Sequence, residues 1–269
     1  MDRDSELRLT GWALILGASS GFGEATALEL ARRGMDIFGV HLDRRATMPN
    51  VERIAGAIQA LGRRAVFFNV NAADPDKRKE VIDVMERESV GGDPRVRVLM
   101  HSLAFGTLRP FITEPAAEGI SKAQMDMTCD VMAHSLVYWT QELVGRGLLG
   151  ADSRIFAMTS SGGHRVLPSY GAVSAAKAAL ESHVRQLAYE LAPRRITANA
   201  ICAGVTDTPA LRKIPGNDVI LRTALERNPS RRLTTPEDVA RSIAALAHPL
   251  TGWITGNVIQ ADGGEDIAG

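Results

Sequence analysis

The chain has 269 residues, of which 45% are hydrophobic and 23% charged, a size and composition that suit one large α/β domain or two small ones. Its 31 basic side chains balance 31 acidic ones, so the chain has no net positive charge to attract nucleic acids or anionic membranes. The charged N-terminus has no apolar signal core, and no run reaches the roughly 18 apolar residues of a membrane span, so we expect a cytoplasmic protein. Cys129 and Cys202 have neither metal-site nor disulfide spacing, so we expect no metal.

Apolar runs alternate with amphipathic helical stretches along the whole sequence. In chain order we predict a strand over Trp12–Gly17, a helix over Gly23–Gly34, a strand over Ile37–Val40, a helix over Val51–Leu61, a strand over Ala65–Val70, a helix over Lys77–Glu88, a strand over Val96–Met100, one long helix over Ala123–Leu149, a strand over Arg154–Met158, a helix over Gly171–Leu191, a strand over Ile196–Ile201, a helix over Pro236–Ala247 and a strand over Trp253–Gln260. About seven apolar strands with helices between them predict an α/β fold with a doubly wound parallel sheet, covered on both faces. Because no Pro- or Ser-rich linker divides the chain, we expect a single domain over residues 1–269.

Two connections are long enough to suggest a function. The first covers Phe105–Ser121, after the fourth predicted strand, and the second covers Gly204–Arg232, after the sixth. We interpret the second as a loop that closes over a substrate.

A glycine-rich turn joins the first strand to the first helix, with the sequence Gly17-Ala18-Ser19-Ser20-Gly21-Phe22-Gly23. Glycines permit a tight turn and let the backbone approach a pyrophosphate closely, and the helix N-terminus beyond them supplies free N–H groups. We therefore expect phosphate contacts from this turn, at Gly17, Ser19, Ser20, Gly21, Phe22 and Gly23.

Tyr170 and Lys177 stand seven positions apart on a predicted helix, after Ser160 at the end of the fifth strand. Seven steps of about 100° bring both side chains to one helix face, about 10 Å apart along the axis. Both side chains can therefore act at one site.

The sequence resembles the short-chain dehydrogenase/reductase family over nearly its whole length, through the glycine turn, the Ser–Tyr–Lys set and the C-terminal Gly256…Asp262-Gly263-Gly264. The resemblance implies a Rossmann-type fold that binds a nicotinamide dinucleotide, and a catalytic pair of Tyr170 and Lys177 with Ser160 as a helper through hydrogen bonding. It also implies further cofactor contacts at Asn69 and Val70 against the adenine, at Ser102, Leu103 and Ala104, and at Gly204, Thr206 and Thr208 in the loop that meets the nicotinamide.

The cofactor type depends on the residues that close the second strand, where the family reads the adenosine ribose. We place His41 at that position, followed by Leu42-Asp43-Arg44-Arg45. Arginines such as Arg44 bind a 2′-phosphate, which favours NADP(H), with NAD also possible. With a register shifted by two residues, Asp43 would instead accept hydrogen bonds from the ribose hydroxyls and favour NAD.

Most members of the family separate their catalytic Tyr and Lys by three residues, and here six residues lie between them. The wider spacing resembles the enoyl-acyl-carrier-protein reductases, as do His101-Ser102, Asp130 and the stretch Asn199–Gly204. Many of these enzymes carry a second Tyr where this chain has Ser160 or Ser161, a substitution shared with their NADPH-using Bacillus-type branch. The resemblance implies an enoyl thioester substrate on acyl-carrier protein or coenzyme A, and a homotetramer.

The spacing has a chemical interpretation. Hydride delivered to the β-carbon of an enoyl thioester creates negative charge on the thioester oxygen, farther from the nicotinamide than a ketone oxygen would be. We expect Tyr170 to hydrogen-bond that oxygen, and Lys177 to bind the nicotinamide ribose and lower the pKa of the Tyr170 phenol. The alternatives are a ketone or alcohol oxidoreductase of the β-ketoacyl reductase type, and a non-catalytic dinucleotide-binding regulatory protein.

Overall fold

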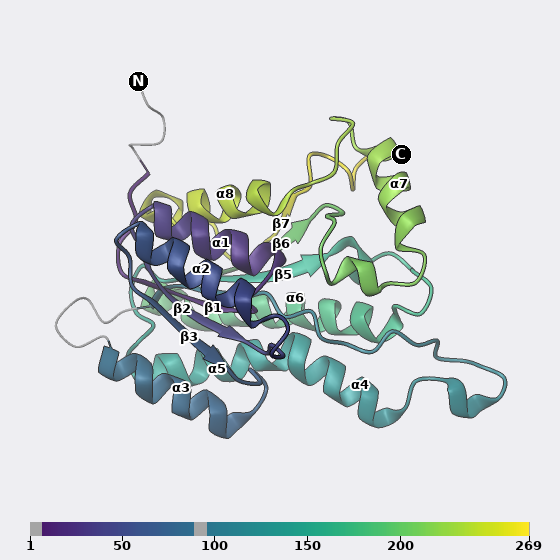
Figure 1. Cartoon of the computed structure of the whole chain (residues 1–269), viewed down its shortest axis with the longest axis horizontal. Coiled ribbons are helices and arrows are strands. Elements are labelled where there is room, and N and C mark those ends of the chain that lie inside the picture. Colours follow the sequence, from purple (N-terminus) through teal and green to yellow (C-terminus); the bar gives the residue numbers. More distant parts are fainter. Residues whose placement is uncertain (1–6, 89–95, 269) are drawn as a thin grey trace.

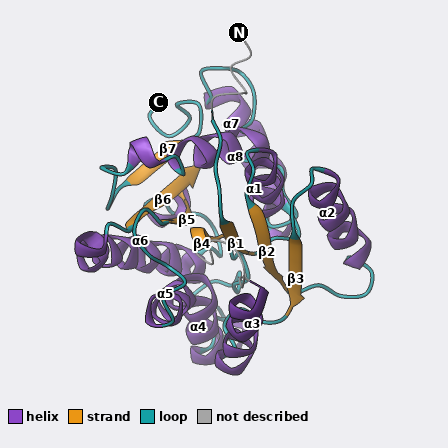
Figure 2. Ribbon diagram, turned by 90° about the vertical axis from the view of Figure 1, so that its left-hand side faces the viewer, coloured by secondary structure: helices purple, strands orange, loops and turns teal. Residues whose placement is uncertain are grey.

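The computed structural model describes residues 7–88 and 96–268, which form one sheet of seven parallel strands between two layers of helices (Figures 1 and 2). The strand order is β3-β2-β1-β4-β5-β6-β7, so the chain winds outward in both directions from the boundary between β1 and β4. The bounds are β1 (Trp12–Leu16), β2 (Asp36–His41), β3 (Ala65–Asn69), β4 (Val96–His101), β5 (Arg154–Ser160), β6 (Thr197–Ala203) and β7 (Val258–Ala261). The predicted doubly wound sheet is confirmed, and a fold of this kind binds ligands at the carboxyl ends of its strands, where the winding direction reverses.

Each face of the sheet packs against its own set of helices and forms its own apolar core (Figure 2). One face is covered by α1 (Gly21–Arg32), α2 (Met48–Ala60) and α8 (Pro236–Leu246). The other face is covered by α3 (Pro75–Glu88), α4 (Lys122–Cys129), α5 (Ser135–Gly145) and α6 (Gly171–Leu191). The central strands are buried on both sides, which is why they appear in the sequence as continuous apolar runs rather than as alternating ones.

The long helix predicted over residues 123–149 is divided by a π-helical turn at Asp130–His134 and ends at Gly145. A π turn adds one residue to a helical turn, a change that no hydrophobic period reveals, and such turns often occur at functional sites. Here it brings Ser135 beneath the end of β4, where its hydroxyl contacts the His101 ring.

Two predictions near the C-terminus need correction. The last strand does not start at Trp253, which is 97% exposed and follows a short turn at Pro249–Thr251; the strand pairs only over Val258–Ala261. The loop predicted over residues 204–232 contains a helix, α7 (Asn217–Arg227), that begins after Gly216 in the left-handed region at φ +75°. None of the described helices is both long enough and apolar enough to cross a membrane.

Candidate active site

The glycine turn between β1 and α1 is shaped by contacts that only glycine permits. A Cβ on Gly17, whose φ is +93°, would lie 2.4 Å from the Ser102 carbonyl oxygen, and one on Gly23 would lie 1.9 Å from the Gly17 oxygen. Ser20 precedes α1 without forming a side-chain cap, so the N–H groups of the first turn receive no acceptor from it. The turn therefore presents free backbone donors and a helix N-terminus, which fit the pyrophosphate of a dinucleotide.

The segment after β4 and the loop after β6 both lie against this turn. The Ser102 amide donates to the Leu16 carbonyl over 2.8 Å, and this bond keeps Ser102 and the following Leu103 and Ala104 beside the glycines. From the other side, the Thr208 methyl group would contact a Cβ on Gly21 at 3.5 Å. The structure thus brings together residues from three loops that the sequence predicted to bind the cofactor.

His41 closes β2, as predicted, but its ring is buried and Asp43 is the group that faces the glycine turn. His41 Nδ1 lies 2.9 Å from Asp43 Oδ2. Burial would raise the pKa of the Asp43 carboxyl, but hydrogen bonds from Ser19, Thr47 and His41 together hold it below its usual value. A carboxylate therefore lies beside the hydroxyl of Ser19 at the corner where a cofactor ribose would bind.

The two arginines after Asp43 are exposed, and within the described residues neither guanidinium has a hydrogen bond or an ion pair. Arg44 contributes only its carbonyl, which accepts a 3.0 Å hydrogen bond from the Thr47 hydroxyl. Both cations are therefore free to meet an anionic group at this corner.

Asn69 and Val70 lie where β3 ends, and each already has a partner. The Asn69 amide accepts from the Asp43 N–H over 2.9 Å and donates to the Asp43 carbonyl over 3.0 Å, and the Val70 N–H donates to the His41 carbonyl over 2.8 Å. Asn69 thus holds the loop that carries Asp43 and Arg44. Two residues beyond the strand, the exposed Asn71 side chain accepts the Ala73 N–H over 3.0 Å and shapes the turn that follows.

Tyr170 stands directly before α6 and is 8% exposed. Its ring lies over Gly162, where a Cβ would be 2.5 Å from the Tyr170 Cε1 atom and 3.2 Å from the Ser160 Oγ atom. Ser160 accepts from the Gly162 N–H over 3.0 Å, which fixes its hydroxyl. The structure therefore brings Ser160 and Tyr170 together at Gly162, and the helper role of Ser160 stays a prediction.

The expectation that Lys177 would lower the pKa of Tyr170 is wrong, because burial raises that pKa and only the Ser160 hydroxyl opposes the shift. The phenol is consequently held as a hydrogen-bond donor. Lys177 is 5% exposed, and its Nζ donates to the Met158 carbonyl over 2.7 Å. Burial lowers the pKa of Lys177 to about 8, against the opposing influence of Glu181 and Cys202.

The position four residues before Lys177, where most of the family carries its tyrosine, is Val173 here. Val173 is 5% exposed and packs with Met132 in a small apolar cluster, and a Cβ on Gly106 would approach both side chains to within 3 Å. The chain has three tyrosines, of which Tyr138 stacks under Arg78 and Tyr189 is 81% exposed. Tyr170 is therefore the phenol available to this site.

The start of the loop after β6 is tightly packed. A Cβ on Gly204 would lie 2.3 Å from the Thr234 hydroxyl oxygen. The Thr206 hydroxyl donates to the Gly204 carbonyl over 3.0 Å, and the Thr208 hydroxyl accepts from the Leu211 N–H over 3.2 Å. Thr206 and Thr208 are both buried, so this loop is shaped before any cofactor binds.

His101, at the end of β4, is completely buried, and its Nε2 lies 2.8 Å from the Ser135 hydroxyl. Burial, together with the charge of Lys177, lowers the pKa of His101 to about 3, so the ring is neutral. Its role in this structure is to join β4 to the π turn.

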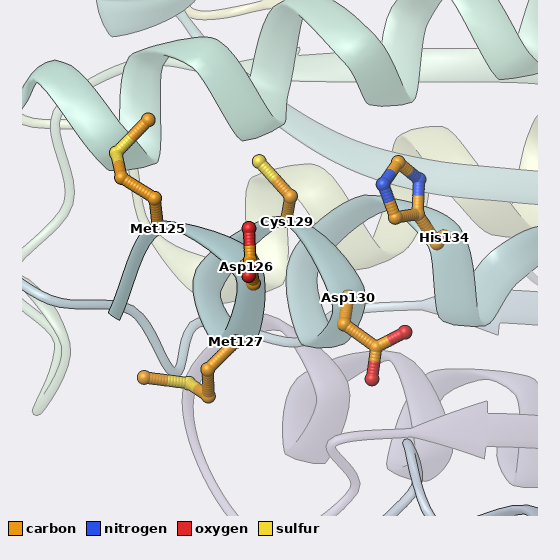
Figure 3. A pocket seen from close by; sticks show the side chains of 6 residues that line it. All are labelled: Met125, Asp126, Met127, Cys129, Asp130 and His134. Carbon is orange, nitrogen blue, oxygen red and sulfur yellow. The ribbon is translucent and has the colours of Figure 1, made fainter. Parts of the chain in front are cut away.

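An open hollow on the outer side of α4 is separate from this site (Figure 3). Its walls come from α4 and the π turn, and they do not include Ser160, Tyr170 or Lys177. Asp130, one of the residues that carry the enoyl-reductase resemblance, begins the π turn and lines this hollow, where Figure 3 shows it pointing away from the side on which Cys129 and His134 project.

A model of the family described as Enoyl-(Acyl carrier protein) reductase matches residues 17–265. The chain belongs to this family, of the short-chain dehydrogenase/reductase type. The structure of an enoyl-acyl-carrier-protein reductase (NADH) from Aquifex aeolicus is similar to it, with a TM-score of 0.83 and 26% identity over 98% of both chains. The family uses a nicotinamide dinucleotide, so the protein is an NAD(P)-dependent oxidoreductase.

Relatives in sequence differ in their substrates. The 1-cyclohexenylcarbonyl-CoA reductase of Streptomyces collinus is 30% identical, with 95% of this chain and 86% of the relative covered. The NADPH-dependent aldehyde reductase-like protein of Arabidopsis thaliana is 29% identical, with 94% of this chain and 93% of the relative covered. The 3-oxoacyl-acyl-carrier-protein reductase of Thermotoga maritima is 28% identical, with 96% and 99% covered. Family membership therefore fixes the cofactor class and leaves the substrate to the site.

Proposed function

We propose that this protein reduces the carbon–carbon double bond of a trans-2-enoyl thioester with NADPH. The observation that carries the proposal is the position of the phenol. Tyr170 lies beside Ser160 at the start of α6, where both side chains approach Gly162, and the position one helical turn closer to Lys177 is filled by buried Val173. The donor is thus displaced outward by about 5 Å along the helix, in the direction in which the oxygen of a conjugated thioester lies beyond the carbon that receives hydride.

When bound, a reduced nicotinamide supplies the hydride, which adds to the β-carbon of the substrate. The electron pair of the double bond then moves toward the thioester, and its oxygen gains negative charge. The Tyr170 O–H donates a hydrogen bond to that oxygen, and burial favours this role because it raises the pKa of the phenol and keeps it protonated. A proton from water then adds to the α-carbon, which restores the thioester carbonyl.

Lys177 and Ser160 support this donor in different ways. The Lys177 ammonium uses one N–H for the Met158 carbonyl, so two remain for the hydroxyls of a nicotinamide ribose. Its positive charge favours the developing negative charge on the substrate. Ser160, fixed by Gly162, orients the phenol.

The preference for NADPH rests on Arg44 and Arg45. Their free guanidinium groups suit a 2′-phosphate, which binds arginine through paired charged hydrogen bonds. The Asp43 carboxylate would repel the same phosphate, but its Oδ2 already lies 2.9 Å from His41 Nδ1. The reduced cofactor with the extra phosphate is therefore the better partner, and NADH is the second choice.

The acyl part of the substrate would contact exposed apolar side chains on the loops at the carboxyl edge. Phe105, Phe111 and Ile112 lie on the loop after β4, Val166 lies between β5 and α6, and Val219 lies on α7, and each is more than half exposed. A thioester of either acyl-carrier protein or coenzyme A would present such a chain. A relative that acts on an unsaturated acyl thioester, by its name, also supports this class.

The test is oxidation of NADPH and of NADH with three substrates in parallel: crotonyl thioester, acetoacetyl thioester and a simple ketone. We expect turnover of the crotonyl thioester, with NADPH preferred. Turnover of acetoacetyl thioester without crotonyl turnover would replace the proposal by a β-ketoacyl reductase activity, the function of a relative with 28% identity. Cofactor binding with no turnover of any substrate would indicate a dinucleotide-binding protein without this catalysis.

A further inference from the structure

The C-terminal segment Asp262–Ala268 is bonded to the loop that separates the two candidate catalytic hydroxyls. Asp266 Oδ1 lies 2.8 Å from Arg165 Nη2, and Asp266 Oδ2 lies 3.1 Å from His164 Nε2. The same Arg165 nitrogen also donates to the Asp266 carbonyl over 2.7 Å. Because the Asp266 side chain is only 17% exposed and the Arg165 side chain 34%, water screens this pair less than an ordinary surface ion pair.

The loop over residues 161–169 packs on the site through Gly162, which lies against the Tyr170 ring, and through Leu167 in the apolar cluster of Tyr170 and Val173. Its other hydrogen bonds are local turns such as the Arg165 N–H to the Ser161 carbonyl at 2.8 Å. Within the described residues, the side-chain hydrogen bonds that it makes to a distant segment all end on Asp266. The loop ends in Ser169 at φ +60°, a left-handed conformation that costs free energy for a residue other than glycine and directly precedes Tyr170.

Asp266 is itself fixed from within its segment. The buried Asp262 carboxylate accepts the Gly264 N–H over 2.9 Å and the Asp266 N–H over 2.8 Å. The Asn228 amide, at the end of α7, donates to the Asp262 carbonyl over 2.9 Å. The segment is therefore a rigid turn with Asp266 at a defined place.

The same turn also contacts two other segments of the site. Glu265 Oε2 accepts the Val205 N–H over 3.0 Å, in the loop that is expected to meet the nicotinamide. Arg227, in the last turn of α7, donates to the Ala268 carbonyl over 2.7 Å. One segment thus touches the loop before Tyr170, the loop after β6 and α7. Figure 1 shows α7 and the C-terminus together at one end of the molecule.

We propose that Asp266 is a positioning residue: through Arg165 it holds the loop over residues 161–169 so that the Tyr170 phenol stays beside Ser160. The Asp266–Arg165 contact opposes the strain at Ser169, because without it the backbone of Ser169 would relax and turn the Tyr170 phenol away from Ser160. The proposal rests on the assigned role of Tyr170 as the donor, and it adds the side chain that keeps this donor in place.

The test is a double-mutant cycle with Asp266→Ala, Arg165→Ala and the double variant, in the full chain. Each single variant should lower kcat about tenfold, because a displacement of about 1 Å at a reacting group has effects of this size or larger. The double variant should lose no more than about tenfold, since both changes remove one interaction. The KM for NADPH should stay within about twofold of wild type, because the glycine turn is untouched.

The matched control is Asp83→Ala, which removes the ion pair of Asp83 with Arg146 on the outer surface of α3, distant in sequence from every loop of the site. It should leave kcat unchanged. Hydrogen exchange supplies a readout that needs no substrate: amides of residues 161–169 should exchange faster in Asp266→Ala and in Arg165→Ala, while those of α1 should not change.

A kcat within twofold of wild type in both single variants would overturn the proposal, as would independent losses that multiply in the double variant. Unchanged exchange over residues 161–169 would overturn it as well, whatever substrate the enzyme uses. If crotonyl thioester is not reduced, the cycle is carried out with the substrate that is turned over, so that the failure of the enoyl assignment and the failure of the Asp266 role are separate results.

Discussion

The two halves of the site at the carboxyl edge of the sheet are built by different means. Around β1 and α1, the backbone forms the site: Gly17 and Gly23 approach other backbone atoms so closely that any Cβ would collide with them. Around β5 and α6, side chains form the site: Ser160, Tyr170 and Lys177 are positioned by contacts with Gly162, with a strand carbonyl and, through the loop, with the C-terminal segment.

The difference suits a family that keeps one class of cofactor while its substrates differ, as the names of relatives with 27–30% identity do. A backbone cradle accepts a pyrophosphate whatever the neighbouring side chains are. Side chains on loops are replaced more readily than a backbone turn. Under the proposed function, the first half binds the cofactor and the second half selects the substrate.

The largest effect should come from the side-chain half, in Tyr170→Phe. Removing the donor to the thioester oxygen should lower kcat for crotonyl thioester about 100- to 1,000-fold, the usual loss for an oxyanion donor. The dissociation constant of NADPH should not change, since the phenol lies beside Ser160 rather than against the turn. Steady-state kinetics and a fluorescence titration measure the two quantities, Tyr189→Phe serves as the exposed control, and a wild-type kcat would remove Tyr170 from the mechanism.

The backbone half should fail in a different manner in Gly23→Ala. A Cβ placed 1.9 Å from the Gly17 oxygen must displace the turn, so we expect binding of NADPH and NADH to weaken equally, by about 100-fold. Isothermal titration with each cofactor measures this loss. Gly56→Ala is the matched control, because nothing lies within 4 Å of a Cβ there and a helical alanine should stabilise the fold by about 1 kcal/mol. Unequal losses for the two cofactors would contradict a purely backbone cradle.

The dependence of kcat/KM on pH tests the role of the Lys177 ammonium, the side chain of the second half that is expected to bind the cofactor. Burial lowers its pKa to about 8, so its charge is present below that pH and is lost above it. We expect kcat/KM for NADPH to fall about tenfold per pH unit above pH 8. Stability should move the opposite way: between pH 8 and the ordinary lysine pKa near ~10.4 the unfolded chain binds the extra proton, so this group adds stability as pH rises.

Rates measured to pH 10 and thermal unfolding over the same range separate the two effects. Lys122→Met, at a side chain that is 88% exposed, should leave both profiles unchanged. A kcat/KM that stays flat to pH 10 would show that the charge of Lys177 is not needed.

The smallest effect should be on cofactor choice at the edge of the backbone half. Arg44→Gln should raise the KM for NADPH about tenfold and leave that for NADH unchanged, because a charged hydrogen bond to a phosphate contributes about 1.5 to 3 kcal/mol. Asp43→Asn should change the preference in the opposite direction by removing repulsion. Arg87→Gln on α3 is the control of equal charge. A greater loss with NADH than with NADPH in Arg44→Gln would reverse the assignment.

Much of the fold was predictable because it follows from local patterns. The strands are apolar runs that two helical layers bury, and their limits agree with the structure to within a few residues, except at Trp253, where an exposed turn replaces a strand. The helix predicted over Pro236–Ala247 corresponds to α8 within one residue, and the structure shows a capping box of Thr235 with Asp238 at its start. The π turn at Asp130–His134 was not predictable, because it depends on the packing of one helix against β4 and α6.

The features of the site likewise fall into those that local sequence determines and those that depend on tertiary contacts. The sequence alone determined the glycine turn, the shared face of Tyr170 and Lys177 and the proximity of Ser160, since these follow from steric limits and helix geometry over short stretches. Only the tertiary structure decided that Asp43 faces Ser19, that Asn69 holds the loop after β2, that Lys177 bonds to Met158 and that Asp266 reaches Arg165. These contacts all join residues between 19 and 101 positions apart. Which of many polar side chains become partners across such distances is settled by the packing of the whole sheet, and no local pattern in the chain records it.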